Sequence, residues 1–344
     1  MTTKIVIAQN GVLSKEDLKE AGHIIREGGL VVFPTETVYG LGGDATNAES
    51  SAKIYAAKGR PSDNPLIIHV NSPFETSRYA VTNEIYDNLA KVFMPGPLTV
   101  ILPKRPIIPL CTTGGLDSVA VRCPSNPIAR SLIREAGVPI AAPSANLSGK
   151  PSPTCARHVI DDLYGKVDMI IDGGDCDIGL ESTIIKLDGK VATLLRPGAV
   201  TADALRCVCD SVTIAPAVLE QIGADEHPLS PGMKYKHYAP SVPFILLNGK
   251  EENIVSFLKK EQKGKNCAIL CYDEEIPTFQ NGKTIAIGKA DSLETQARRL
   301  FTALRDADKL GVDVIYGHLP PKDGIGLALY NRMIRAAAHT IMNV

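Results

Sequence analysis

The sequence contains no tryptophan, and aromatic residues make up only 5 % of its 344 positions. Proteins that bind single-stranded nucleic acid stack the bases on aromatic side chains, so this composition argues against such a binding mode. The net charge is −1, with 37 Lys and Arg residues against 38 Asp and Glu residues. A protein that coats nucleic acid by bulk charge is therefore not expected, although a local basic cleft remains compatible with this balance.

Long apolar runs and metal-binding motifs are also missing. No apolar stretch reaches the roughly 18 residues of a membrane-spanning helix, and the N-terminal segment lacks the pattern of a secretory signal. The eight cysteines form no C-x-x-C pair and have no histidine at zinc-ligand spacing. We therefore expect a cytoplasmic protein with no protein-bound metal, whose thiols are reduced and mostly buried.

What is present is typical of a globular chain, with 44 % hydrophobic and 22 % charged residues, and the length predicts two domains. Up to residue 212, short apolar runs typical of strands alternate with segments that have one apolar face at helical spacing. The segment 182–196 has a hairpin pattern, in which Asp188 and Gly189 suit a two-residue turn. We therefore predict that residues 1–212 form an α/β domain with a twisted mixed sheet.

The pattern changes after residue 212. Residues 213–241 are rich in Pro, His and charge, have no periodicity, and are predicted to be a linker. Residues 242–344 then alternate strands and helices again, which predicts a smaller Rossmann-like α/β domain. Its longest helix is expected over 291–311, with Asp291 as the N-cap.

Candidate ligand-binding residues gather where the predicted strands of the first domain end, which is where α/β folds place ligands. Four segments there are rich in uncharged polar residues: PTETVYG (34–40), KGRPSDNPL (58–66), APSANLSG (142–149) and LESTII (180–185). The cations near them are few, and Arg can bind a phosphate or carboxylate through two hydrogen bonds. These cations are Lys58, Arg60, Arg122 and Arg196.

Each candidate has a purely structural alternative. Lys58 and Arg60 suit a solvated helix end, where cations stabilise the helix dipole. His69 lies among aliphatic residues, as a core histidine does. Arg122 is different, because it ends an apolar strand where a buried charge needs a partner, so a functional role is favoured. The polar segments suit an ordinary turn or an edge strand equally well.

Common nucleotide and hydrolase motifs are absent. The sequence contains no P-loop, no G-x-S-x-G, no H-E-x-x-H and no EF-hand loop. Residues 40–45 match the loose G-x-G-x-x-A form of the dinucleotide-binding motif, but no acidic residue follows at a strand end about 20 residues on. Binding of a nicotinamide cofactor is therefore not predicted.

Eight segments nevertheless form an ordered series between residues 14 and 240: PTETVYGLG (34–42), KGRPSDNPL (58–66), MPGPLTVIL (94–102), VAVRCP (119–124), APSANLSGKPSPT (142–154), ESTII (181–185), LRPG (195–198) and SPGMKYKHYAP (230–240). In this series the chain resembles the threonylcarbamoyl-adenylate synthases with a YrdC-like domain, in their long two-domain form. The resemblance implies a twisted sheet around a concave, positively charged cavity.

The resemblance also implies a reaction. L-threonine, bicarbonate or carbon dioxide, and ATP with Mg²⁺ would give threonylcarbamoyl-AMP and pyrophosphate. Partner proteins would then transfer the threonylcarbamoyl group to an adenosine next to the anticodon of certain tRNAs. Direct contact of this chain with tRNA, and the role of its C-terminal domain, do not follow from the resemblance.

Site residues follow from the same motifs. The residues implied for threonine are Thr37, His69, Arg122, Ala142 and Ser182, with Arg122 on the carboxylate. Those implied for ATP are Lys58, Arg60, Asn64, Ser118, Ser144, Ser152 and Arg196. Lys58 and Arg60 would act in catalysis, and Tyr235 or His237 of the linker would touch the nucleotide as part of a lid.

Two other functions remain open. One is an RNA-binding module with a basic concave surface, against which the net charge and the scarce aromatics argue. The other is carbamoyl transfer to a different acceptor by a related domain. Threonine-dependent pyrophosphate release distinguishes the predicted synthase from both.

Overall fold

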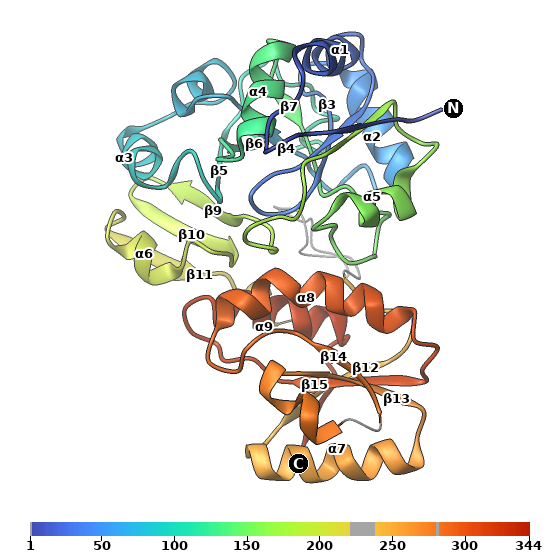
Figure 1. Ribbon diagram of the computed structural model, residues 1–344. Coiled ribbons are helices and arrows are strands. Elements are labelled where there is room, and N and C mark those ends of the chain that lie inside the picture. The colour runs from blue at the N-terminus through green and yellow to red at the C-terminus, as the bar shows by residue number, and fades with distance from the viewer. Residues whose placement is uncertain (1, 221–237, 280–281) are drawn as a thin grey trace. The chain divides into compact units, whose positions relative to one another are not determined.

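The computed structural model describes residues 2–220, 238–279 and 282–344 (Figure 1). These residues form two compact units. The N-terminal unit contains residues up to 148 together with 152–177 and 181–220. The C-terminal unit contains residues from 238 onward together with 149–151 and 178–180.

The N-terminal unit is built on an eleven-stranded sheet. Its strands are β1 (Lys4–Ile7), β2 (Val31–Phe33), β3 (Gly40–Asp44), β4 (Ile67–His69), β5 (Leu98–Pro103), β6 (Ser118–Arg122), β7 (Ile140–Ala141), β8 (Met169–Asp172), β9 (Thr183–Asp188), β10 (Val191–Arg196) and β11 (Ser211–Ile214). Its helices are α1 (Lys15–Arg26), α2 (Ala48–Lys58), α3 (Glu84–Phe93), α4 (Pro127–Ala136), α5 (Ala156–Leu163) and α6 (Ala202–Arg206), with the short 3₁₀ helices η1 (Pro73–Arg78) and η2 (Pro216–Val218).

The strand order in this sheet is β1-β8-β2-β3-β7-β4-β6-β5-β9-β10-β11. The sheet contains both parallel pairs, such as β4 with β6, and antiparallel pairs, such as β5 with β6. The predicted mixed α/β sheet is therefore confirmed. The strand β11, which pairs with β10, includes residues 213 and 214, where the sequence suggested that a linker begins.

Helices α1 and α4 pack beside each other (Figure 1) and share a buried cluster with residues of β2. Ile25 of α1 and Leu132 of α4 are fully buried in one cluster with Phe33 of β2. Burial of each such side chain contributes about 1.5–3 kcal/mol. The two helices approach closely at Gly22, where a Cβ atom would lie 2.7 Å from Cγ of Glu135. A larger residue at position 22 would push them apart.

Local sequence signals explain most helix ends. Ser14 caps α1, because its Oγ accepts a hydrogen bond from the backbone N–H of Asp17 at 3.0 Å. Two predictions are wrong by one residue. The cap of the long C-terminal helix is Ser292 and not Asp291, since Ser292 accepts from the N–H of Thr295. The hairpin turn comprises residues 189 and 190, because Asp188 still pairs with Val191.

The C-terminal unit is a smaller α/β fold with a five-stranded sheet. Its strands are β12 (Phe244–Asn248), β13 (Cys267–Cys271), β14 (Lys283–Ala286), β15 (Val314–His318) and β16 (Ile341–Asn343). Its helices are α7 (Glu251–Gly264), α8 (Leu293–Asp308) and α9 (Gly326–Ala336), with the 3₁₀ helix η3 (Asp273–Phe279). All strand pairs are parallel, in the order β14-β13-β15-β12-β16. Helix α7 covers one face of this sheet, and α8 and α9 cover the other (Figure 1).

The cysteines are free, as predicted, and most are in the core. The buried ones are Cys123, Cys176, Cys209, Cys267 and Cys271. Burial raises the pKa of the Cys123 thiol to about 11, so this group stays protonated at neutral pH. Within the described ranges, no helix combines the length and apolar character needed to cross a membrane.

Candidate functional site

Three of the central strands bring polar side chains to one edge of the N-terminal sheet. His69 ends β4 and pairs with Arg122, which ends β6. Arg122 in turn pairs with Thr99 at the start of β5. Residues that face each other on neighbouring strands point to the same side of the sheet. His69, Arg122 and Thr99 therefore form one row across three strands, which we call the Arg122 row.

The β9–β10 hairpin extends this row. The hydroxyls of Ser182 and Thr99 lie 2.7 Å apart. Arg196, at the end of β10, donates from Nε to the carbonyl of Ser182 at 3.0 Å and from Nη2 to its Oγ at 3.1 Å. The register of β10 shifts between Leu194 and Arg196, and such a bulge re-aims the side chains that follow it. Thus residues from distant motifs meet at this edge.

Arg122 is buried, and its guanidinium faces a carboxylate. Nη2 of Arg122 lies 2.7 Å from Oε1 of Glu36, and both side chains are about 5 % exposed. The contact is an ion pair without hydrogen-bond geometry, and Oε2 of Glu36 has no hydrogen-bond partner among the described residues. Glu36 lies in the PTETVYG segment but was not predicted as a site residue. Its burial beside a cation could not be read from the sequence.

His69 is a neutral imidazole in this surrounding. Burial and the neighbouring charge of Arg122 lower the pKa of His69 to about 3. Its Nδ1 atom is buried without a hydrogen-bond partner in the part of the chain that is described. The ring meets the edge of Phe33, with centroids 6.3 Å apart. His69 is therefore available as an uncharged hydrogen-bonding group beside a cation.

On the same face of the sheet, a row of apolar residues lies between the Arg122 row and the opposite end of β6. Ile67, Ala120 and Ile101 pair across β4, β6 and β5, and they belong to one buried cluster. Ser118 lies beyond these apolar residues at the start of β6. With a rise of about 3.3 Å per residue, Ser118 is about 13 Å from Arg122 along the strand, on the same side of the sheet. These two predicted residues are therefore not in contact.

A second polar group surrounds the end of α2. Lys58 is buried, and its ammonium donates to the backbone carbonyls of Ser144 and Asn146. Oγ of Ser144 donates to Oδ1 of Asn146. Gly59 terminates the helix with a φ of +60°, a left-handed conformation that suits glycine. Lys58 thus holds the PSANLSG segment against α2, which a solvated helix end would not do.

Arg60, two residues after Lys58, binds Asn64, which is another predicted site residue. Its Nη2 donates to Oδ1 of Asn64 at 2.6 Å and to the carbonyl of Pro65 at 3.0 Å. Ser152 donates to a carboxylate oxygen of Glu181, the residue before Ser182. Ser152 is therefore linked through the chain to the Arg122 row.

The remaining predicted residues have these positions. Thr37 is fully buried, and its hydroxyl lies 2.9 Å from that of Thr35. Ala142 follows β7 and donates its N–H to the carbonyl of Ile67. Tyr235 and His237 lie outside the described residues. The structure thus groups His69, Arg122, Ser182 and Arg196 with Thr99 and Glu36, and it separately pairs Lys58 with the Ser144 segment and Arg60 with Asn64. Glu36 and Thr99 were not predicted.

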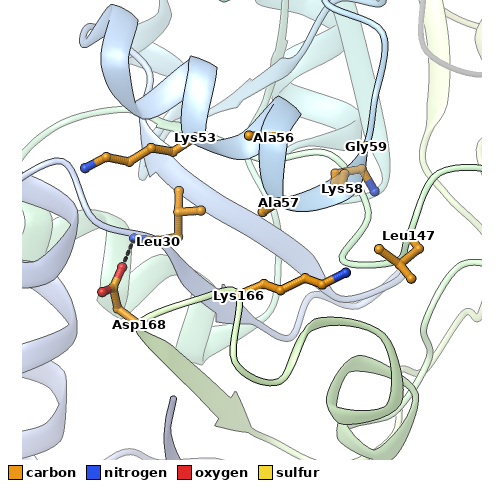
Figure 2. A pocket seen from close by; sticks show the side chains of 9 residues that line it. All are labelled: Leu30, Lys53, Ala56, Ala57, Lys58, Gly59, Leu147, Lys166 and Asp168. Atoms are coloured by element: carbon orange, nitrogen blue, oxygen red, sulfur yellow. Dashed lines mark hydrogen bonds between the residues drawn. The ribbon is translucent and has the colours of Figure 1, made fainter. Parts of the chain in front are cut away.

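A cavity of about 740 Å³ lies beside the C-terminal half of α2 (Figure 2). Its lining is largely apolar, with Leu30, Ala56, Ala57 and Leu147, and it includes Lys53 and Lys166. Lys53 donates to the carbonyl of Gly28 at 2.7 Å. Among the predicted site residues that the structure describes, only Lys58 lines this cavity, and its ammonium binds the Ser144 segment instead.

Comparisons with known proteins agree on one family. A family model described as telomere recombination matches residues 23–198, and a model described as threonylcarbamoyl-AMP synthase, C-terminal domain, matches residues 200–338. The chain is 42 % identical over 328 residues to the threonylcarbamoyl-AMP synthase of Bacillus subtilis, with 94 % of each protein covered. It is 44 % identical over 349 residues to that of Pyrococcus abyssi, with 99 % of each covered.

A solved structure gives the same result. The crystal structure of P. abyssi Sua5 complexed with L-threonine matches with a TM-score of 0.89 and 42 % identity, over 100 % of both chains. Sequence and fold therefore agree along the whole length of the chain. This chain belongs to the threonylcarbamoyl-AMP synthase family.

Proposed function

We propose that the N-terminal unit forms threonylcarbamoyl-AMP from L-threonine, bicarbonate or carbon dioxide, and ATP, with release of pyrophosphate. The observation that supports this most directly is the Arg122 row, in which a buried cation, a neutral imidazole and two hydroxyls share one sheet edge. Such a row offers one charged and several neutral groups to a small amino acid. The name of the ligand in the P. abyssi complex agrees with this substrate.

In this proposal Arg122 binds the carboxylate of threonine. A guanidinium can meet a carboxylate through two hydrogen bonds, and burial strengthens the interaction. Glu36 already faces Nη2, so the substrate either displaces that contact or approaches the guanidinium from another side. Ser182, Thr99 and Thr37 supply neutral partners for the polar atoms of threonine.

The amine of threonine combines with carbon dioxide to give a carbamate. A carbamate oxygen then attacks the α-phosphorus of ATP, and the bond to pyrophosphate breaks. Negative charge spreads over the phosphate oxygens in this step, so catalysis needs positioning and cations more than a protein nucleophile. We assign this task to Lys58, Arg60 and Arg196, together with Asn64, Ser118, Ser144 and Ser152.

Mg²⁺ would accompany the phosphates of ATP and neutralise part of their charge. Among the described residues, no group of three His, Cys, Asp or Glu side chains could hold a metal ion. This suits an ion that phosphates and water hold, with one or two protein contacts at most. We therefore name no protein residue as its ligand.

The product is a mixed anhydride of a carbamate and a phosphate, which water hydrolyses readily. We propose that partner proteins of the cytoplasm consume it and transfer the threonylcarbamoyl group to an adenosine of tRNA. The proposed lid, with Tyr235 or His237 on the nucleotide, would exclude water from the product.

The test is pyrophosphate release from ATP and bicarbonate, with and without L-threonine. Release that depends on threonine supports the proposal, and other amino acids in its place should give little. Equal release with another amino acid would indicate carbamoyl transfer to a different acceptor. RNA binding with a steep salt dependence and no turnover of ATP would support the RNA-binding alternative.

A further inference from the structure

The C-terminal unit has a feature that the synthase reaction does not use. The chain leaves β12 through α7 toward β13, and it leaves the neighbouring strand β15 through α9 toward β16. These connections run in opposite directions along the sheet, and the helices lie on opposite faces (Figure 1). In open parallel sheets, ligands bind in the crevice beyond the carboxyl ends of two such strands.

A pocket of about 250 Å³ occupies this position, and we call it the switch-point pocket. Glu251 and Ile254 of α7 line it, with Tyr272 after β13 and His318 and Leu319 at the end of β15. Pockets for drug-sized molecules measure about 300–1,000 Å³, so this one suits a smaller ligand. Every residue that lines it belongs to the C-terminal unit.

His318 lines the pocket, and its neighbours hold its ring in one orientation. Its Nε2 lies 2.9 Å from Oε2 of Glu275, and both side chains are 8 % exposed. The same oxygen accepts the backbone N–H of Tyr272 at 2.9 Å. The Tyr272 ring stacks on the imidazole, with centroids 4.5 Å apart and an angle of 22° between the planes. A carboxylate accepts a hydrogen bond, so Nε2 carries a hydrogen, and with a single proton on the ring Nδ1 is an acceptor.

The charge of the pocket limits what it can bind. Among the described residues that line it there is no Lys or Arg, whereas Glu251 contributes a carboxylate. Oε1 of Glu275 is buried and has no hydrogen-bond partner among the described residues, so the environment is already rich in acceptors. Burial, and then the charges of Glu275 and Glu251, raise the pKa of Tyr272 to about 12. Its hydroxyl therefore keeps its proton, and an anionic ligand would meet uncompensated negative charge.

We propose that the switch-point pocket binds a small, non-anionic molecule through hydroxyl or amine donors. Glu251 and Nδ1 of His318 accept these donors, the hydroxyl of Tyr272 adds one adaptable partner, and Ile254 and Leu319 contact the carbon skeleton. The proposed ligand therefore presents several hydrogen-bond donors on a small carbon skeleton. Two sources provide such donors: a vicinal diol, as in the ribose of a nucleoside, and an aliphatic amine.

Calorimetric titration of the full-length protein tests this, with D-ribose, adenosine, 1,4-diaminobutane and inorganic phosphate as separate probes. Binding of ribose and adenosine identifies a diol site, and binding of the diamine alone identifies a cation site. Phosphate should not bind to the switch-point pocket, so any phosphate binding at the proposed ATP site should be equal in the parent protein and in Glu251→Gln. Phosphate binding that Glu251→Gln alters, or no binding of ribose, adenosine or the diamine that Glu251→Gln weakens, overturns the proposal.

Two variants locate any binding that is observed. Glu251→Gln removes the carboxylate in the pocket and should weaken binding by roughly tenfold or more. Glu252→Gln is the matched control, because Glu252 is exposed in the same first turn of α7 and does not line the pocket. Equal affinity of both variants for the bound probe contradicts the assignment. The ring ¹⁵N resonances of His318, identified by their loss in His318→Gln, should shift on binding.

This inference stands apart from the proposed synthase activity. Glu251→Gln should leave threonine-dependent pyrophosphate release without the probe unchanged, because none of the described residues assigned to the reaction lines this pocket. Arg122→Ala should leave binding in the switch-point pocket unchanged. A chain without synthase activity that still binds the probe would refute only the first proposal.

Discussion

The guanidinium of Arg122 lies 2.7 Å from the carboxylate of Glu36, and both groups are buried. Charges removed from water are tolerated only when they are paired, so this contact explains how an apolar strand can end on an arginine. It also means that Arg122 has a structural partner as well as its proposed substrate. Loss of either charge would affect stability and activity together, and the two effects have to be separated.

Arg122→Ala should lower threonine-dependent pyrophosphate release by roughly 10–150-fold, the range for one charge-assisted contact. It should also cost about 3–5 kcal/mol of stability, because Glu36 is left buried without a partner. The double variant Glu36→Gln/Arg122→Ala should recover most of the stability but not the activity. Urea unfolding and the pyrophosphate assay measure the two effects. An active double variant would reject the proposed role of Arg122.

The low pKa of His69 predicts a stability that depends on pH. The pKa is about 3 in the folded protein and 6.5 without perturbation, so below pH 6.5 the unfolded chain binds a proton that the folded chain does not. The contribution of His69 to stability is therefore present above pH 6.5 and is lost as the pH falls toward 3. At pH 5 the loss should be about 2 kcal/mol.

Urea unfolding of the protein and of His69→Gln at pH 7.5 and pH 5 measures this difference. The variant should lose less stability than the parent between the two pH values. His23→Gln is the control, since the side chain of His23 is 64 % exposed. If His69→Gln shows the same pH dependence as the parent, His69 is not the group responsible.

The sequence was sufficient to predict features that depend on neighbouring residues. The alternation of strands and helices and the β9–β10 hairpin can each be recognised from short stretches of the chain. The short motifs marked where strands end, which is why candidate site residues could be named from the sequence. The one-residue errors at Asp291 and at the hairpin turn arose because adjacent residues can both satisfy such a pattern.

The sequence could not reveal contacts that depend on the register between distant strands. Glu36 is 86 positions from Arg122, and Thr99 is 83 positions from Ser182. Only the strand order brings these segments together, and nothing local distinguishes Glu36 from a solvent-exposed loop residue. The motifs alone also gave no reason to separate Ser118 from Arg122, which the structure places at opposite ends of β6.

Ser182→Ala tests the hydroxyl part of the Arg122 row. The change removes an oxygen that lies 2.7 Å from the hydroxyl of Thr99 and accepts from Arg196. Stability should fall by about 0.5–1.5 kcal/mol, and KM for threonine should rise by roughly tenfold if the hydroxyl binds the substrate. Thr193→Ala on β10 is the control, because the hydroxyl of Thr193 accepts a hydrogen bond from that of Thr213 on β11, in an exposed position. An unchanged KM for threonine in Ser182→Ala would limit Ser182 to a structural role.

Lys58→Met tests whether the buried lysine of α2 acts on ATP. The side chain of Met has a similar length but no donor, so the carbonyls of Ser144 and Asn146 lose the hydrogen bonds from the ammonium. Each lost partner costs about 1–3 kcal/mol, and the Ser144 segment should lose its position against α2. The expected kinetic result is a fall in kcat together with a higher KM for ATP.

Lys53→Met is the matched control, because Lys53 lies on the same helix and its ammonium binds the carbonyl of Gly28. Similar ATP kinetics in the two variants would show that Lys58 only supports the fold, and a selective loss in Lys58→Met would support its role at the phosphates.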